Sequence, residues 1–122
     1  MILGILSGCQ SQNQSDGPGY GVLPPALFNE VIQTHKDLIL LDVRTPAEFS
    51  NGKIEGARNL DVQSPDFVEQ LNKLDKNAEY GIYCALGRRS AFAIDKMKSM
   101  GFTRLYDLGG GYNAWMSEKD KK

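Results

Sequence analysis

Short apolar runs alternate with amphipathic segments along most of this chain, and that alternation constrains the fold more than any other feature. Residues 38–43 (LILLDV) and 80–84 (YGIYC) are almost wholly apolar, as expected for strands covered on both faces of a parallel sheet. Residues 57–60 are a weaker strand candidate, and residues 103–108 are predicted to form the last strand. Helical segments separate these runs, so the sequence predicts an α/β domain with a mostly parallel sheet.

Helix start and stop signals stand between the predicted strands. Thr45 and Glu48 form a capping box, with Pro46 at the first helical position. Gly101 is a stop signal for the helix that precedes it. The expected helices begin at Pro24–Pro25, at Thr45–Pro46, at Ser64–Pro65, at Arg88 and just after Gly111.

Length and charge exclude several classes of protein. A chain of 122 residues suits a single domain, which we expect to span residues 20–118, followed by a charged tail at 119–122 and present as a monomer. The formal net charge of −1 argues against a dedicated nucleic-acid binder, because neutralising phosphates requires a basic surface. The two cysteines lie in unlike contexts and do not form a disulfide framework.

The N-terminal segment carries a separate signal. Residues 6–9 (LSGC) resemble the lipobox of bacterial lipoproteins, and the apolar stretch before them is short, as in a truncated start. The resemblance implies that residues 1–8 are removed, that Cys9 is lipidated, and that the protein is tethered to a membrane in the periplasm or cell envelope. The polar residues 9–19 would then form a disordered linker. The alternative is an incidental cysteine on a flexible N-terminus of a cytoplasmic protein.

Cys84 is the strongest candidate for chemistry, because it ends a buried strand and precedes the loop 85–90 and a helix. Ligands collect at the carboxyl ends of strands in open α/β sheets. Such a loop can turn its N–H groups inward and form an anion cradle with the helix dipole. Arg88 and Arg89 would favour the thiolate, and Gly87 allows a tight curl. The alternative is an inert core thiol.

Several motifs together resemble those of single-domain rhodaneses, a sulfurtransferase family with a doubly wound α/β fold. These motifs are residues 40–44 (LLDVR), 48–49 (EF), 52–57 (GKIEGA), 84–90 (CALGRRS) and 108–111 (LGGG), with Trp115. The resemblance runs from about Leu23 to Trp115. It implies helices on both faces of the sheet and a catalytic Cys84, which takes sulfur from a small anionic donor such as thiosulfate and passes it to a thiol or cyanide. Neither a metal nor an organic cofactor is implied.

The resemblance also suggests roles for the residues around the cysteine. The substrate-binding loop would be Ala85, Leu86, Gly87, Arg88 and Arg89. Ser90 would support it. Asp42 and Arg44 lie at the end of a predicted strand and could line the site, but from that position we expect them mainly to fix loops through hydrogen bonds. Ala85 stands where the family often has a basic residue, and Leu86 beside it makes the rim of the site more apolar.

The sequence leaves two alternatives to a sulfurtransferase that turns over. The same fold could serve as a persulfide carrier or as a protein-binding module. A different enzyme, a phosphatase or an arsenate reductase, is disfavoured because Cys84 and Arg89 form a Cys-x4-Arg loop. That loop is one residue shorter than the Cys-x5-Arg loop of those enzymes, and a smaller cradle suits a single sulfur atom better than a phosphoryl group.

Overall fold

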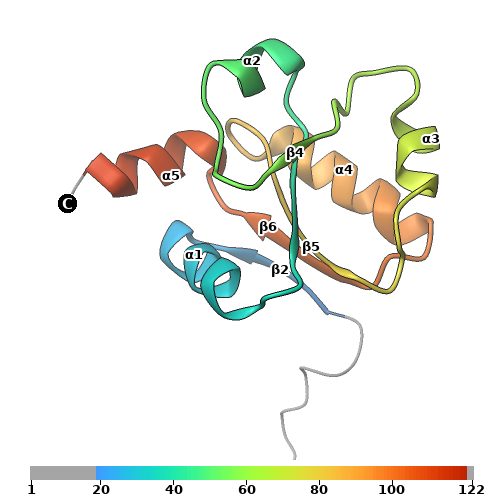
Figure 1. Cartoon of the computed structure of the whole chain (residues 1–122), viewed down its shortest axis with the longest axis horizontal. Helices are drawn as coiled ribbons and strands as arrows, with labels where there is room; N and C mark the ends of the chain where they lie inside the picture. The colour runs from blue at the N-terminus through green and yellow to red at the C-terminus, as the bar shows by residue number, and fades with distance from the viewer. Residues whose placement is uncertain (1–18, 121–122) are drawn as a thin grey trace, which may run out of the picture.

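Strands and helices alternate strictly through residues 19–120, the part of the chain that the structure, a computed structural model, describes (Figure 1). In chain order the elements are β2 (Gly19–Leu23), α1 (Pro25–Thr34), β3 (Ile39–Asp42), α2 (Pro46–Ser50), β4 (Arg58–Asn59), α3 (Phe67–Asn72), β5 (Glu79–Tyr83), α4 (Arg88–Ser99), β6 (Arg104–Leu108) and α5 (Gly111–Asp120). The predicted α/β class is confirmed.

The five described strands form one sheet in the order β2-β6-β5-β3-β4, and every pairing is parallel. The carboxyl ends of all these strands therefore lie along one edge of the sheet. Central strand β5 pairs with β3 on one side, where Tyr83 lies opposite Asp42, and with β6 on the other. Cys84 follows β5 directly, so it lies at the middle of the carboxyl edge, where parallel sheets place ligands.

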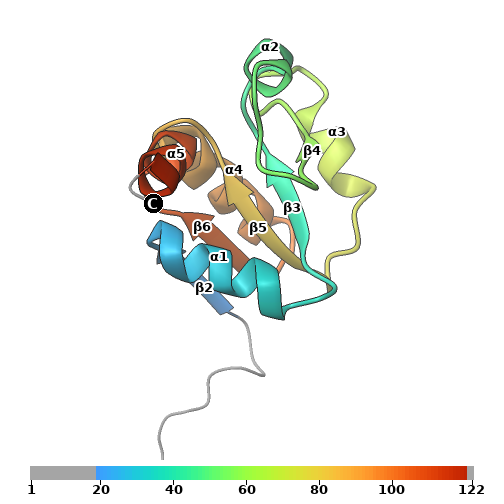
Figure 2. The same ribbon diagram turned by 60° about the vertical axis from the view of Figure 1, so that its left-hand side comes forward.

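Helices cover both faces of the sheet, as the resemblance implies. Helices α1 and α5 pack on one face, and α3 and α4 pack on the other (Figures 1 and 2). Consecutive strand residues point to opposite faces, so Leu40 belongs to the α1/α5 core and Leu41 to the α3/α4 core. Trp115 of α5 contacts Phe28 of α1 edge-to-face, with ring centroids 6.3 Å apart. Both faces need apolar side chains, which is why these strands read as unbroken apolar runs.

Strand β2 is not predicted from the sequence. It pairs only with β6 at the edge of the sheet, and Tyr20 and Val22 are 47% and 59% exposed. The strand also contains two glycines, Gly19 and Gly21, which are depleted in strands. Without a buried face it has no hydrophobic pattern to detect, and its pairing partner lies more than 80 residues further along the chain.

Some predicted boundaries move by a few residues. Gly19, placed in the linker, is the first residue of β2, and residues 119–120, placed in the tail, complete α5. Helix α3 begins at Phe67 rather than at Ser64, because residues 64–66 form a turn stabilised by the side chains of Ser64 and Asp66. The predicted signal segment, the lipidation of Cys9 and the linker up to residue 18 lie outside the described residues. Within residues 19–120, no helix has both the length and the apolar composition needed to cross a membrane.

Asp107 on β6 is a buried carboxyl group with an unsatisfied oxygen. It is 4% exposed, and its Oδ1 has no hydrogen-bond partner among the described residues. Burial raises the pKa of Asp107 to about 6, although the Ser90 hydroxyl opposes the shift. The folded state therefore holds a proton between about pH 4 and pH 6 that an unfolded aspartate releases. Stability falls as the pH rises through this window, because the folded state binds more protons there than the unfolded state.

Replacing Asp107 by asparagine should stabilise the protein at neutral pH. The amide keeps the shape but removes the buried charge, so the free energy of unfolding at pH 7 should increase by about 1–3 kcal/mol. Urea unfolding in the presence of a reductant, at pH 7 and at pH 4, measures this. The gain should shrink at pH 4, where the native carboxyl is already protonated. An equal gain at both pH values would contradict the burial argument, and Asp95→Asn on the exposed side of α4 is the control.

Candidate active site

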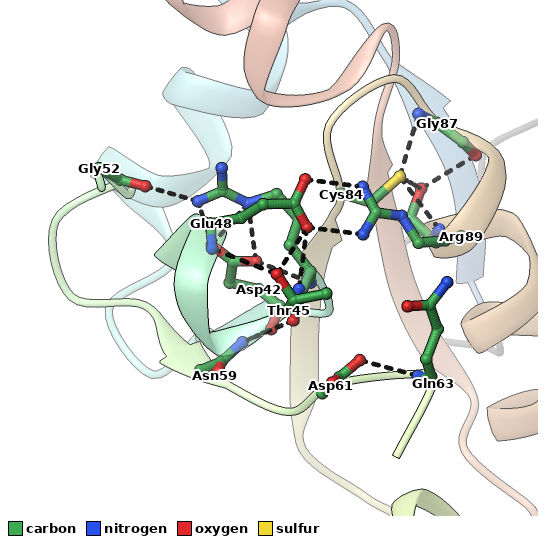
Figure 3. Close-up of polar contacts among 12 residues, drawn as sticks. Asp42, Thr45, Glu48, Gly52, Asn59, Asp61, Gln63, Cys84, Gly87 and Arg89 are labelled. Carbon is green, nitrogen blue, oxygen red and sulfur yellow. Dashed lines mark hydrogen bonds and ion pairs between the residues drawn. The ribbon is translucent and has the colours of Figure 1, made fainter. Parts of the chain in front are cut away.

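The sulfur of Cys84 lies at the N-terminus of helix α4. The Gly87 N–H donates a hydrogen bond to Sγ at 3.0 Å (Figure 3). The Ser90 N–H donates a second one at 3.3 Å. The Ser90 Oγ lies 3.6 Å from Sγ and donates to the Gly87 carbonyl at 3.1 Å. Gly87 has a φ of +117°, which favours glycine, and this conformation turns its N–H toward the sulfur. The site therefore presents helix-terminal donors to one atom.

These donors make the thiol more acidic despite its burial. Burial raises the pKa of Cys84 and is the largest single influence on it. The Ser90 hydroxyl and the N–H groups of Ser90, Gly87 and Leu86 all lower the pKa and together outweigh burial. The net pKa lies below the ordinary value of a cysteine, so the site favours the thiolate, which is the nucleophilic form.

The N–H groups that face the sulfur differ in part from those predicted for the anion cradle. Residues 85–89 are expected to supply it, but the donors toward the sulfur are those of Leu86, Gly87 and Ser90. In the described part of the chain, no hydrogen bond joins Sγ to the N–H groups of Ala85, Arg88 or Arg89. Ser90, expected to have only a supporting role, contacts the sulfur through both its backbone and its side chain.

Helix α5 holds the loop in this orientation from the opposite side. The Tyr112 N–H donates to the Cys84 carbonyl at 2.7 Å, and the Asn113 N–H donates to the Ala85 carbonyl at 3.1 Å. Gly111 permits this approach, because a Cβ there would lie 2.4 Å from the Ala85 carbonyl oxygen. Because α5 binds the carbonyls of Cys84 and Ala85, the loop is held so that the later N–H groups of Gly87 and Ser90 face the sulfur. The three consecutive glycines before Tyr112 are the sequence signal that could have indicated this contact. From the sequence they are interpreted only as a turn.

A pocket of about 330 Å³ opens above the cysteine. Its lining consists of Gln63, Cys84, Ala85, Leu86, Arg88 and Arg89. Cys84 is only 1% exposed and lies at the bottom, whereas Leu86 is 69% exposed and lies at the rim. The pocket therefore lies directly against the buried cysteine. Gln63 is a lining residue that sequence reasoning missed, because it comes from the loop before α3.

Arg89 is engaged by a carboxylate. Its two terminal nitrogens lie 2.8 and 3.0 Å from the two oxygens of Glu48, and the two groups face each other in Figure 3. The hydrogen bond from Arg89 lowers the pKa of Glu48 to about 2. Glu48 also accepts a hydrogen bond from the Thr45 N–H at 3.0 Å, which completes the predicted capping box. Arg88 is exposed and has no ion-pair partner within residues 19–120.

Asp42 and Arg44 lie behind the site and do not line the pocket. Both are buried, and Arg44 donates to the Asp42 carboxylate through Nε at 3.0 Å and through Nη2 at 2.7 Å. Nη2 also donates to the Gly52 carbonyl at 2.6 Å, and the guanidinium lies 4.5 Å from the ring centroid of Tyr112. The pair thus joins β3 to the loop after α2 and to α5. This placement agrees with the interpretation that both residues fix loops.

The fold and the site together define a class: an α/β protein with an acidic cysteine cradled between a central strand and a helix N-terminus. The chain belongs to the rhodanese-like domain family, whose family model matches residues 25–118.

Relatives and solved structures agree with this assignment. The chain is 38% identical over 85 residues to "Thiosulfate sulfurtransferase 16, chloroplastic" of Arabidopsis thaliana, covering 62% of this chain and 71% of that protein. It is 35% identical over 78 residues to "Thiosulfate sulfurtransferase GlpE" of Stutzerimonas stutzeri, covering 63% and 69%. The crystal structure of a rhodanese-related protein from Thermoplasma volcanium has a TM-score of 0.71 and 30% identity, covering 81% of this chain and 93% of that one. These similarities support sulfurtransferase activity in general.

Removing the Ser90 hydroxyl should make Cys84 less acidic. Ser90→Ala removes the side-chain contact that lowers the pKa of Cys84 but keeps the backbone N–H, so the pKa of Cys84 should rise. The rate of Cys84 alkylation by iodoacetamide against pH, followed by peptide mass spectrometry, reports this pKa. Ser99→Ala, in the last turn of α4, is the control. An unchanged profile for Ser90→Ala would refute the role of the hydroxyl.

Proposed function

We propose that this protein is a sulfurtransferase in which Cys84 takes a sulfane sulfur from a donor such as thiosulfate, holds it as a persulfide and passes it to a thiophilic acceptor. The observation that carries the proposal is the convergence of the Gly87 and Ser90 N–H groups on a thiol at the bottom of a pocket. Membership of the rhodanese-like family supports sulfur transfer in general.

In the first step, the Cys84 thiolate attacks the outer sulfur of the donor. A new S–S bond forms, the S–S bond of the donor breaks, and its electron pair leaves on sulfite when the donor is thiosulfate. The product is a Cys84 persulfide anion, so two sulfur atoms now share the negative charge. The N–H groups at the start of α4 are placed to stabilise that charge. Because the pKa of Cys84 is already lowered, this step needs no separate general base.

In the second step, an acceptor attacks the terminal sulfur of the persulfide. Cyanide gives thiocyanate, and a thiolate acceptor gives its own persulfide, while the electron pair of the broken S–S bond returns to Cys84 as thiolate. Each step exchanges one nucleophile for another on a sulfur atom, which is the double-displacement pattern of covalent catalysis. Neither step requires a metal or a redox cofactor for its electron balance.

Loading and turnover of Cys84 test the proposal. After incubation with thiosulfate, the intact mass of the protein should increase by one sulfur atom. Cyanide should remove that atom, and repeated cycles should release thiocyanate continuously. Cys84→Ser should abolish both signals while the thermal unfolding transition remains, because serine has no thiolate to carry sulfur. Cys9→Ser is the matched control and should behave like the native protein.

Three other outcomes are informative. Loading without turnover would support a persulfide carrier on the same fold. Neither loading nor turnover, together with hydrolysis of an aryl phosphate, would replace the proposal with a phosphatase. Full activity in Cys84→Ser would remove the proposed nucleophile.

A further inference from the structure

Asp107 and Cys84 lie on the same face of the sheet, on neighbouring strands. Asp107 of β6 pairs in register with Ile82 of β5, and Cys84 follows Ile82 by two residues. Ile82 and Cys84 both belong to the α3/α4 core, because side chains alternate along a strand. Leu105 belongs to the same core, so Asp107, two residues later, also points toward α4. Asp107 and Cys84 are therefore diagonal neighbours, with Cα atoms on the order of 8 Å apart.

The Ser90 hydroxyl connects these two groups. Its Oγ lies 3.6 Å from the sulfur of Cys84, and the same side chain lowers the pKa of Asp107 against the larger effect of burial. Ser90 is fully buried and donates its proton to the Gly87 carbonyl at 3.1 Å. A hydroxyl group has only one proton to donate. The Gly87 carbonyl, a thiolate on Cys84 and a carboxylate on Asp107 therefore compete for it.

Asp107 has no cationic partner among residues 19–120. Its Oδ1 accepts no hydrogen bond, and none of the ion pairs in this range includes it. On β2, burial raises the pKa of Tyr20, and Asp107 and Asp95 add to the shift. Helix α4 carries Asp95 and Lys98, both exposed, and the Lys98 Nζ lies 4.3 Å from the ring centroid of Tyr20. The buried charge of Asp107 is therefore relieved by protonation or by the Ser90 hydroxyl.

We propose that Asp107 is a positioning residue that controls the acidity of Cys84 through Ser90. A protonated Asp107 can donate to the Ser90 Oγ, which leaves the hydroxyl proton of Ser90 free to turn toward the sulfur and stabilise the thiolate. An ionised Asp107 instead accepts that proton and adds a second negative charge near the thiolate. The part of this inference that concerns sulfur transfer rests on the proposed function.

This coupling keeps Cys84 reactive at mildly acidic pH. Burial raises the pKa of Asp107 to about 6. As the pH falls through this value, Asp107 takes up a proton, and the repulsion that disfavours the thiolate is lost. The pKa of Cys84 therefore decreases in the same range in which the fraction of thiolate would otherwise fall steeply. Two groups that interact in this way titrate as a pair.

The pH profile of Cys84 alkylation tests the inference. The rate with iodoacetamide is followed by peptide mass spectrometry from pH 5 to pH 10, with a reductant present. For the native protein, a plot of the logarithm of the rate against pH should have a shoulder near pH 6, where Asp107 titrates. The slope should return to one above the shoulder, until the thiol is fully ionised. A native profile without a shoulder would overturn the inference.

Asp107→Asn fixes the uncharged state. Asparagine has no charge, and its NH2 group can donate to the Ser90 Oγ, so the variant resembles the protonated acid at every pH. The shoulder should disappear and the midpoint of the profile should move to lower pH. The variant should react at least about twofold faster than the native protein at pH 7 and equally fast at pH 5, as expected for coupled neighbours. Asp95→Asn on the exposed side of α4 should keep the native profile.

Ser90→Ala tests the route of the coupling. In this background the rates with and without Asp107→Asn should differ less than they do with Ser90 present, because the connecting hydroxyl is gone. An equal effect in both backgrounds would overturn the route through Ser90. Arg89 also acts on Cys84 electrostatically, but its ion pair with Glu48 is unchanged in all these variants.

Alkylation uses no sulfur donor, so the inference and the proposed function fail separately. Loading of Cys84 with sulfur but no shoulder, and no shift in Asp107→Asn, would keep the proposed function and remove the inference. A shoulder without any loading would refute sulfur transfer and still support control of the thiol by Asp107. If Asp107→Asn shows no cooperative thermal transition, the native profile and the weaker shoulder expected in Ser90→Ala decide.

Discussion

Helix α4 begins with backbone N–H groups that have no partners within the helix, and the structure aims two of them at the sulfur of Cys84. Much of the surrounding structure keeps this arrangement in place. Strand β5 carries the cysteine to the centre of the carboxyl edge, and the start of α5 binds the carbonyls of Cys84 and Ala85. Because burial alone would raise the pKa of the thiol, its acidity depends on this close contact between a strand end and two helix ends.

Two arginine–carboxylate pairs act differently around this centre. The Asp42–Arg44 pair is buried, and its hydrogen bonds join β3 to the loop after α2. The Glu48–Arg89 pair joins α2 to the first turn of α4 beside the pocket that Arg89 lines.

Much of the fold could be predicted because its signals are local. The capping box of Thr45 and Glu48 is read from four consecutive residues and is present in the structure. Strand β2 could not be predicted, since its stability comes from pairing with β6 rather than from its own pattern. The loop around Cys84 is recognisable from its composition, but which of its N–H groups face the sulfur depends on the positive φ of Gly87 and on the contact with α5.

The amino-acid sequence by itself determined the parallel α/β class, the position of Cys84 at a strand end and the glycines that its loop requires, because each is encoded by neighbouring residues. The tertiary structure alone decided the partner of Arg89. The sequence predicts that this arginine attracts the donor, yet its guanidinium binds Glu48, which lies 41 positions earlier in the chain. It likewise decided that Asp107 is buried without a partner for one oxygen. Such pairings depend on distances between elements that are remote in sequence, and no local pattern records them.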